Sequence, residues 1–162
     1  MILRFFIFLV VLTFVFPAYV LAATLQGQVV KVADGDTITV QDDMGRKHRI
    51  RLAGIDAPEM NQPYGLHSKN NLMSLVDGEM VTVQYEKRDR YGRIVGKVLF
   101  RGGDICLEQV KVGLAWHYKF YQREQAQEDR QLYADGEKGA RLIRMGLWVE
   151  LDPVPPWKWR RR

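Results

Sequence analysis

Residues 25–52 read LQGQVVKVADGDTITVQDDMGRKHRIRL, and this stretch decides the fold. It contains three short runs rich in Val, Ile and Thr, separated by turns built from Asp and Gly. Such runs are typical of β-strands, because branched side chains pack well on a pleated surface. We therefore expect strands at Leu25–Val32, Thr37–Gln41 and Lys47–Leu52.

The third strand carries an arginine next to apolar residues. Because successive side chains point to opposite faces of a strand, Ile50 and Leu52 share one face while Arg49 and Arg51 share the other. The apolar pair can enter a core only if Arg51 points away from that core. We therefore expect the Arg51 side chain to face a cleft or solvent.

The rest of the chain predicts two more strands and three helices. These elements are a helix at Tyr64–Leu75, strands at Val81–Tyr85 and Arg93–Phe100, a helix capped by Asp104, and a last helix at about Arg123–Met145. Gly136 and Gly139 lie inside the last helix and each costs about 1 kcal/mol relative to Ala, so we expect a break or fraying there. Five strands with a helix between the third and fourth predict an α+β fold with a small closed barrel of the OB type.

The composition is that of one globular domain. Of the 162 residues 47% are hydrophobic and 27% are charged, which excludes a disordered chain. The formal charge of +5 comes from 24 Lys and Arg residues against 19 Asp and Glu residues. Five of the basic residues lie at the two ends of the chain, namely Arg4, Lys158, Arg160, Arg161 and Arg162. The domain between them is formally neutral, so only local clusters of charge can argue for a nucleic-acid partner.

The N-terminus, MILRFFIFLVVLTFVFPAYVLA at residues 1–22, predicts an export signal. One Arg precedes an apolar run, and Val20 and Ala22 stand at positions −3 and −1 of a cleavage site after Ala22. We expect a cleaved signal peptide and a periplasmic or secreted protein. The alternative is that residues 2–22 stay as a membrane anchor, since the run is close to the ~20 residues that span a bilayer. The chain thus divides into a leader (1–22), a barrel domain (23–150) and a basic tail rich in Pro, Trp and Arg (151–162).

Three segments combine acids and arginines in a pattern suited to phosphodiester chemistry: DGDTITV at 34–40, RLAGIDAPE at 51–59 and DRYGR at 89–93. Asp36 and Asp56 could converge on one hard cation, which carboxylates, carbonyls and waters bind. Arg51 and Arg93 match phosphate oxygens and could stabilise the charge of the transition state. Glu59 is then left to activate or position the attacking water.

Each of these segments also has an ordinary structural interpretation. Asp-Gly-Asp is a common turn, and an Asp-x-Pro-Glu segment is typical of the start of a helix. Arg93 could be a solvated hairpin residue, and the basic run at residues 46–51 could be a wet strand face. It is the ordered combination of the segments that favours a catalytic site.

These segments, in this order and at this spacing, resemble the two signature regions of the staphylococcal nuclease (thermonuclease) family. The resemblance extends over residues 24–149, including the closing Gly146-Leu147-Trp148. It implies an OB-type barrel of five strands with three helices. It also implies a calcium-dependent endonuclease that hydrolyses DNA and RNA, prefers single strands, leaves 3′-phosphate ends and works as a monomer.

The resemblance implies a cation site as well. Asp36 and Asp56 become calcium ligands, with the backbone carbonyl of Ala57 as a third, and Asp34 becomes an acid close behind them. Ala57 stands where the type member of the family has Thr, a change that a backbone ligand tolerates. The loop at Met60–Pro63 is shorter and less basic than the corresponding loop of the type member, so we expect a weaker grip on the substrate.

The remaining roles concern the substrate. By the same resemblance Arg51 and Arg93 bind the phosphate and stabilise the transition state, and Glu59 is the proposed general base. Tyr91 matches the position of an aromatic residue near the nucleotide, and Tyr121 matches a second one loosely.

Three further features are open to structural interpretations. The single cysteine, Cys106, excludes an intrachain disulfide and is expected to be a small buried hydrophobe. The aromatic cluster at residues 116–121 is expected to pack in the core as a group, although one of its rings could reach a nucleotide. The tail combines aromatic and cationic residues, and it could touch phosphates, contact an anionic membrane surface or be a disordered end.

Two other classes of function compete with the nuclease. One is a catalytically inactive OB module that binds nucleic acid, and the other is a membrane-associated barrel that binds a protein. The presence of both carboxylates, the glutamate and both arginines favours the enzyme over either alternative.

Overall fold

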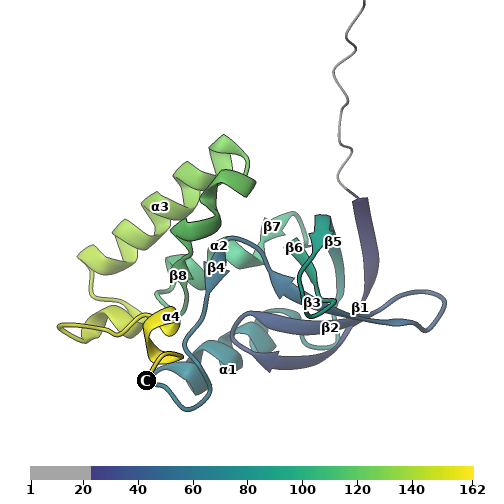
Figure 1. Ribbon diagram of the computed structural model, residues 1–162. Coiled ribbons are helices and arrows are strands. Elements are labelled where there is room, and N and C mark those ends of the chain that lie inside the picture. Colours follow the sequence, from purple (N-terminus) through teal and green to yellow (C-terminus); the bar gives the residue numbers. More distant parts are fainter. Residues whose placement is uncertain (1–22) are drawn as a thin grey trace, which may run out of the picture.

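The computed structural model describes residues 23–162, and its centre is a closed barrel. Antiparallel pairing joins strands β1 (Ala23–Asp34), β2 (Thr37–Gln41), β3 (Lys47–Leu52), β5 (Met80–Arg88) and β6 (Ile94–Phe100) in the order β3-β2-β1-β5-β6. Parallel pairing of Ile50 with Ile94 then joins β3 to β6 and closes the barrel (Figure 1). The predicted five-stranded barrel of the OB type is confirmed, and the predicted leader at residues 1–22 lies outside the described residues.

The helices lie against one side of the barrel (Figure 1). The longer ones are α1 (Gly65–Val76), α2 (Ile105–Lys111) and α3 (Gln127–Leu142). Shorter elements are the 3-10 helices Lys119–Glu124 and Gly146–Val149, the single turn α4 (Pro156–Trp159), and the two-residue strands β4 (Ile55–Asp56), β7 (Gly103–Asp104) and β8 (Trp116–His117). In Figure 1, α2 lies between the barrel and α3, and α4 lies near α1 and β4. Among residues 23–162 the structure has no helix with the length and apolar character needed to span a membrane.

The alternation of the strands explains the barrel core. Ile50 and Leu52 are almost fully buried, while Arg51 on the opposite face of β3 is half-buried, as its strand position predicts. Cys106 is fully buried in the same core, as expected. A second, smaller core consists of Trp116, Ala140, Leu147 and Trp148, with Trp157 of the tail packed against it.

The structure corrects the expectation for the last helix and excludes one of the three alternatives left open for the tail. The last helix runs unbroken through Gly136 and Gly139, and it begins at Gln127 rather than near Arg123. Gly136 faces α2, where an added Cβ would lie 3.3 Å from Leu107 Cδ1, so its small size permits close packing of the two helices. The tail is not a disordered end, because α4 folds and packs on the second core.

Candidate active site

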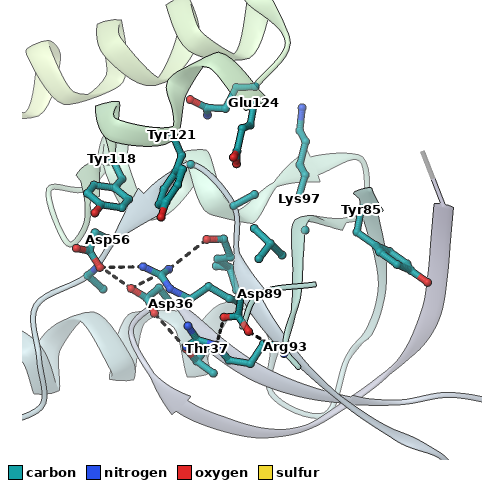
Figure 2. A pocket seen from close by; sticks show the side chains of 18 of the residues that line it. Asp36, Thr37, Asp56, Tyr85, Asp89, Arg93, Lys97, Tyr118, Tyr121 and Glu124 are labelled. Carbon is teal, nitrogen blue, oxygen red and sulfur yellow. Dashed lines mark hydrogen bonds and ion pairs between the residues drawn. The ribbon is translucent and has the colours of Figure 1, made fainter. Parts of the chain in front are cut away.

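Two carboxylates and one arginine converge at the mouth of the barrel. Asp36 lies in the turn between β1 and β2, Asp56 lies on β4, and Arg51 extends from β3. Arg51 Nη1 is 3.0 Å from Asp36 Oδ2, and Arg51 Nη2 is 2.8 Å from Asp56 Oδ1. Figure 2 shows Asp36 and Asp56 next to each other, below Tyr118 and Tyr121. The structure therefore brings together three of the residues that the sequence singles out.

Buried hydrogen bonds fix the turn that presents Asp36. The backbone N–H of Ala57 donates to Asp36 Oδ2 at 2.7 Å, and the Thr37 hydroxyl donates to Asp36 Oδ1 at 3.1 Å. Gln109 of α2 is fully buried, and its Nε2 donates to the carbonyl of Gly35 at 2.8 Å. Gly35 itself has no room for a Cβ, because that atom would collide with the Ser68 side chain. A sharp turn and a helix far away in sequence thus hold Asp36 in place.

The environment of Asp36 disfavours an unpaired negative charge. Burial raises the pKa of Asp36 to about 7, and the charges of Asp34 and Asp56 add to this rise, while Arg51 opposes it. A carboxylate in such a place is stabilised by a further cation. The donors here are carboxylate oxygens, which suit a hard cation such as calcium. Within residues 23–162 no three His, Cys, Asp or Glu side chains are arranged to hold a metal ion, so carbonyls, waters or substrate oxygens must complete the ligand set.

Arg93 lies on the neighbouring side of the site and is oriented by Asp89. Arg93 Nε donates to Asp89 Oδ2 at 2.7 Å, and the Arg93 guanidinium lies 5.6 Å from the centre of the Tyr91 ring. Burial would raise the pKa of Asp89, but hydrogen bonds from Arg93 and Tyr91 outweigh burial and lower it. Asp89 is therefore a stable anion that fixes the direction of the Arg93 side chain. In the part of the chain that the structure describes, the two Nη groups of Arg93 make no ion pair, and they can donate hydrogen bonds to the oxygens of a phosphate.

A cleft of about 1030 Å³ is lined by the carboxylates Asp36, Asp56 and Asp89 and by Arg51 and Arg93. Every residue that the sequence singled out for the site lines it, namely Asp34, Asp36, Arg51, Asp56, Ala57, Glu59, Tyr91, Arg93 and Tyr121. Tyr91 and Tyr121 expose 74% and 42% of their surface, so both rings are accessible to a ligand. A cleft with carboxylates, arginines and exposed aromatic rings is suited to a nucleic-acid strand.

Known proteins match the chain over most of its length. The family model described as "Staphylococcal nuclease homologue" matches residues 49–150. The chain belongs to the staphylococcal nuclease family. The matched residues include Arg51, Asp56, Glu59 and Arg93 but begin after Asp36, which the geometry of the site adds to the set.

Relatives of this nuclease carry names that agree with the family. An "Uncharacterized endonuclease" of Escherichia coli is 45% identical over 150 residues, which are 92% of this chain and 94% of that protein. A protein of the same name from Haemophilus influenzae is 37% identical over 135 residues, or 83% of this chain and 72% of that protein. "Staphylococcal-like nuclease CAN1" of Arabidopsis thaliana is 39% identical over 121 residues, which are 75% of this chain and 36% of that longer protein. The protein is therefore a nuclease, a hydrolase of phosphodiester bonds.

The structure of this nuclease corrects the expectation for the aromatic cluster. Trp116 is buried in the second core as expected, but Phe120 exposes 77% of its surface. The Tyr118 and Tyr121 rings, whose centres are 5.4 Å apart, line the cleft instead of the core. The physical reason is that residues 119–124 form a 3-10 turn that stands clear of the second core, not the first turn of α3.

Sequence reasoning missed several residues that line the cleft of this nuclease. Tyr85 and Lys97 come from the two adjacent strands β5 and β6, and Figure 2 shows them on the side of the cleft away from Tyr118. Strand alternation could have placed Lys97 on the outer face of the barrel, between the buried Gly96 and Val98, but it places Tyr85 on the same face as the buried Val83. Arg160 of the tail also lines the cleft and contacts Asp56, from which it is separated by 104 residues. No local pattern in the sequence could reveal that contact.

Proposed function

We propose that this nuclease hydrolyses DNA and RNA in a calcium-dependent reaction, prefers single strands and leaves 3′-phosphate ends. The observation that carries the proposal is that Arg51 bridges Asp36 and Asp56 in a cleft that also holds Arg93. The two carboxylates can bind a cation, and the two arginines beside them can bind an anionic phosphate in the same cleft.

Calcium would be held by Asp36, Asp56 and the backbone carbonyl of Ala57, with waters and a phosphate oxygen as further ligands. The ligands fit a hard cation because they are oxygen atoms. Burial raises the pKa of Asp36 to about 7, so a nearby positive charge would stabilise its ionised form. Bound calcium would supply Lewis-acid stabilisation of the charge on the phosphate.

The arginines and Glu59 provide the rest of the chemistry. Arg51 and Arg93 bind two phosphate oxygens and stabilise the extra charge that develops on them. Glu59 takes one proton from a water molecule as the water oxygen bonds to phosphorus. The bond from phosphorus to the 5′ oxygen then breaks, and the leaving oxygen takes up one proton to become a 5′-hydroxyl. The phosphate stays on the 3′ side of the upstream nucleotide.

The exposed rings bind the bases without reading them. Tyr91 and Tyr121 line the cleft and are exposed, and stacking of a base on an aromatic ring tolerates any sequence. Contacts to phosphate carry no sequence information either. A stacked base must be free of its partner strand, which favours single-stranded DNA and RNA over duplexes.

We further propose that the protein acts outside the cytoplasm as a monomer. The N-terminal sequence MILRFFIFLVVLTFVFPAYVLA supports export to the periplasm or the medium, with membrane association through the leader or the basic tail as the alternative. Free calcium is plentiful in such compartments, which suits a calcium-dependent enzyme.

The test is hydrolysis of heat-denatured DNA and of RNA by the purified protein, with calcium and then with excess chelator. We expect degradation with calcium and none with chelator, and we expect Asp36→Ala and Arg93→Ala to lower the rate of hydrolysis by about a thousandfold in folded protein. Full activity in either variant would contradict the site assignment. Binding of DNA without any turnover in calcium would favour the inactive binding module.

A further inference from the structure

The C-terminal tail folds back onto the cleft. The Trp157 ring stacks on Tyr118, with ring centres 5.3 Å apart, and meets the edge of Trp116 at 5.5 Å. Trp159 Nε1 donates to Asn61 Oδ1 at 3.2 Å, which ties the tail to the loop that follows Glu59. The tail is thus anchored beside the active site by aromatic packing and a hydrogen bond.

This anchoring brings Arg160 to the acids of the site. Arg160 Nη2 is 2.8 Å from Asp56 Oδ2, and Arg160 Nη1 is 3.2 Å from Asp56 Oδ1. Arg160 Nη1 also donates to Glu59 Oε1 at 2.6 Å. One guanidinium therefore binds both the proposed metal ligand on β4 and the proposed general base.

These contacts leave Asp56 with no free oxygen. Oδ2 accepts from Arg160, and Oδ1 accepts from both Arg51 and Arg160, while the Asp56 side chain is only 1% exposed. A metal ion that binds Asp56 must therefore displace Arg160 or share an oxygen with it. Because two cations at one carboxylate repel each other, binding of the metal ion and docking of Arg160 oppose each other.

Arg160 is well placed to leave the site. Its side chain is 45% exposed, although Asp56 beneath it is almost fully buried. It follows α4 directly, and the contacts that hold α4 are made by Trp157 and Trp159 rather than by Arg160 itself. The guanidinium can therefore swing out while α4 stays docked, and it remains at a high local concentration for return.

We propose that Arg160, which also binds Glu59, is a tethered competitor of the activating metal ion for Asp56, so that the tail sets the calcium concentration at which the site fills. This inference rests on the proposed calcium dependence of the nuclease. Linkage requires reciprocity: Arg160 weakens calcium binding by the same factor by which calcium weakens the docking of Arg160.

The test is calorimetric titration of the full chain with calcium, without nucleic acid, for the wild type, Arg160→Ala and Arg161→Ala. The Arg161→Ala substitution is a matched control, since it removes the same charge from the same segment. Arg161 makes no ion pair among the described residues, whereas Arg160 makes two. We expect Arg160→Ala to bind calcium about fivefold more tightly or better, as is typical of coupled sites, and Arg161→Ala to bind like the wild type. Near-ultraviolet circular dichroism checks that each variant is folded.

A second measurement follows the tail itself. Calcium should speed the cleavage of wild-type protein by trypsin after Arg160, because the displaced guanidinium becomes accessible, and mass spectrometry identifies that cut.

Equal calcium affinity of Arg160→Ala and the wild type would overturn the inference and leave the proposed function intact. Weaker binding by Arg160→Ala would also overturn it, because Arg160 would then support the metal site. If the wild type and both variants bind no calcium, the proposed calcium site and this inference both fail.

Discussion

Asp36 provides the most quantitative prediction, because its ionisation costs stability. Its pKa is 3.8 when unperturbed and about 7 in the folded protein, with burial as the main cause. Between these two pH values the folded protein keeps a proton that the unfolded chain has lost. The free energy of unfolding therefore falls as the pH rises through this window, and the contribution of Asp36 is fully favourable only below the unfolded pKa.

Replacement of Asp36 by Asn removes this pH dependence of the free energy of unfolding. A rise of roughly three pKa units corresponds to about 4 kcal/mol. This rise already includes the attraction of Arg51, whose Nη1 is 3.0 Å from Asp36 Oδ2 and which opposes the effect of burial. Because Asn is neutral at every pH, we expect Asp36→Asn to be about 4 kcal/mol more stable than the wild type at pH 8 and about as stable as the wild type at pH 4, where folded Asp36 is protonated.

The assay is urea unfolding, followed by tryptophan fluorescence, from pH 4 to 8 in the presence of chelator. The quantity of interest is the difference in free energy of unfolding between variant and wild type, which removes the titration of other groups. Asp43→Asn is the control, because Asp43 is exposed and the variant makes the same change of side chain away from the site. A difference for Asp36→Asn that stays constant from pH 4 to 8 would refute the reasoning. Calcium should reverse the order at pH 8, since only the wild type keeps both proposed ligands.

Three further predictions concern activity and the support of the site. Arg93→Ala should lower kcat by about a thousandfold, because it removes a charge that stabilises the transition state, and single-turnover kinetics on a denatured oligonucleotide measures this. Tyr121→Ala should raise KM for single-stranded DNA about tenfold through lost stacking while kcat changes little, as steady-state kinetics will show. Gln109→Ala leaves the carbonyl of Gly35 without its donor, so we expect a loss of about 1–3 kcal/mol in urea unfolding and weaker calcium binding in calorimetry.

Controls separate these effects from loss of fold. Lys111→Ala is a suitable partner for Gln109→Ala, since Lys111 lies on the same helix and pairs with Glu108 at the surface. Unchanged calcium affinity in a destabilised Gln109→Ala would remove the proposed link to the site. An Arg93→Ala variant with wild-type kcat would exclude a role in the transition state, and an unchanged KM in Tyr121→Ala would exclude stacking.

The sequence predicted the barrel because its determinants are local. Strands at residues 25–52 follow from branched residues and turns, and the two faces of β3 follow from alternation of Ile50, Arg51 and Leu52. The last helix was less predictable. The low helix propensity of Gly136 can be read from the sequence, but the close packing against α2 that offsets it depends on the tertiary structure.

The same distinction divides the residues of the site. Asp36, Arg51, Asp56 and Glu59 lie close together in sequence, so their motif could be read directly. Gln109 was not predicted, because its role depends on α2 passing next to the turn at Gly35. The contact of Arg160 with Asp56 spans 104 residues and requires α4 to dock, which neither composition nor periodicity encodes.

The most direct test of the central claim is cleavage of a defined single-stranded oligonucleotide in water enriched with oxygen-18, followed by mass spectrometry of the fragments. With calcium, we expect fragments that end in a 3′-phosphate carrying one oxygen-18 atom, and with excess chelator we expect intact substrate. Fragments with labelled 5′-phosphate ends, or equal cleavage in chelator, would contradict the proposed calcium-dependent attack on phosphorus with departure of the 5′ oxygen.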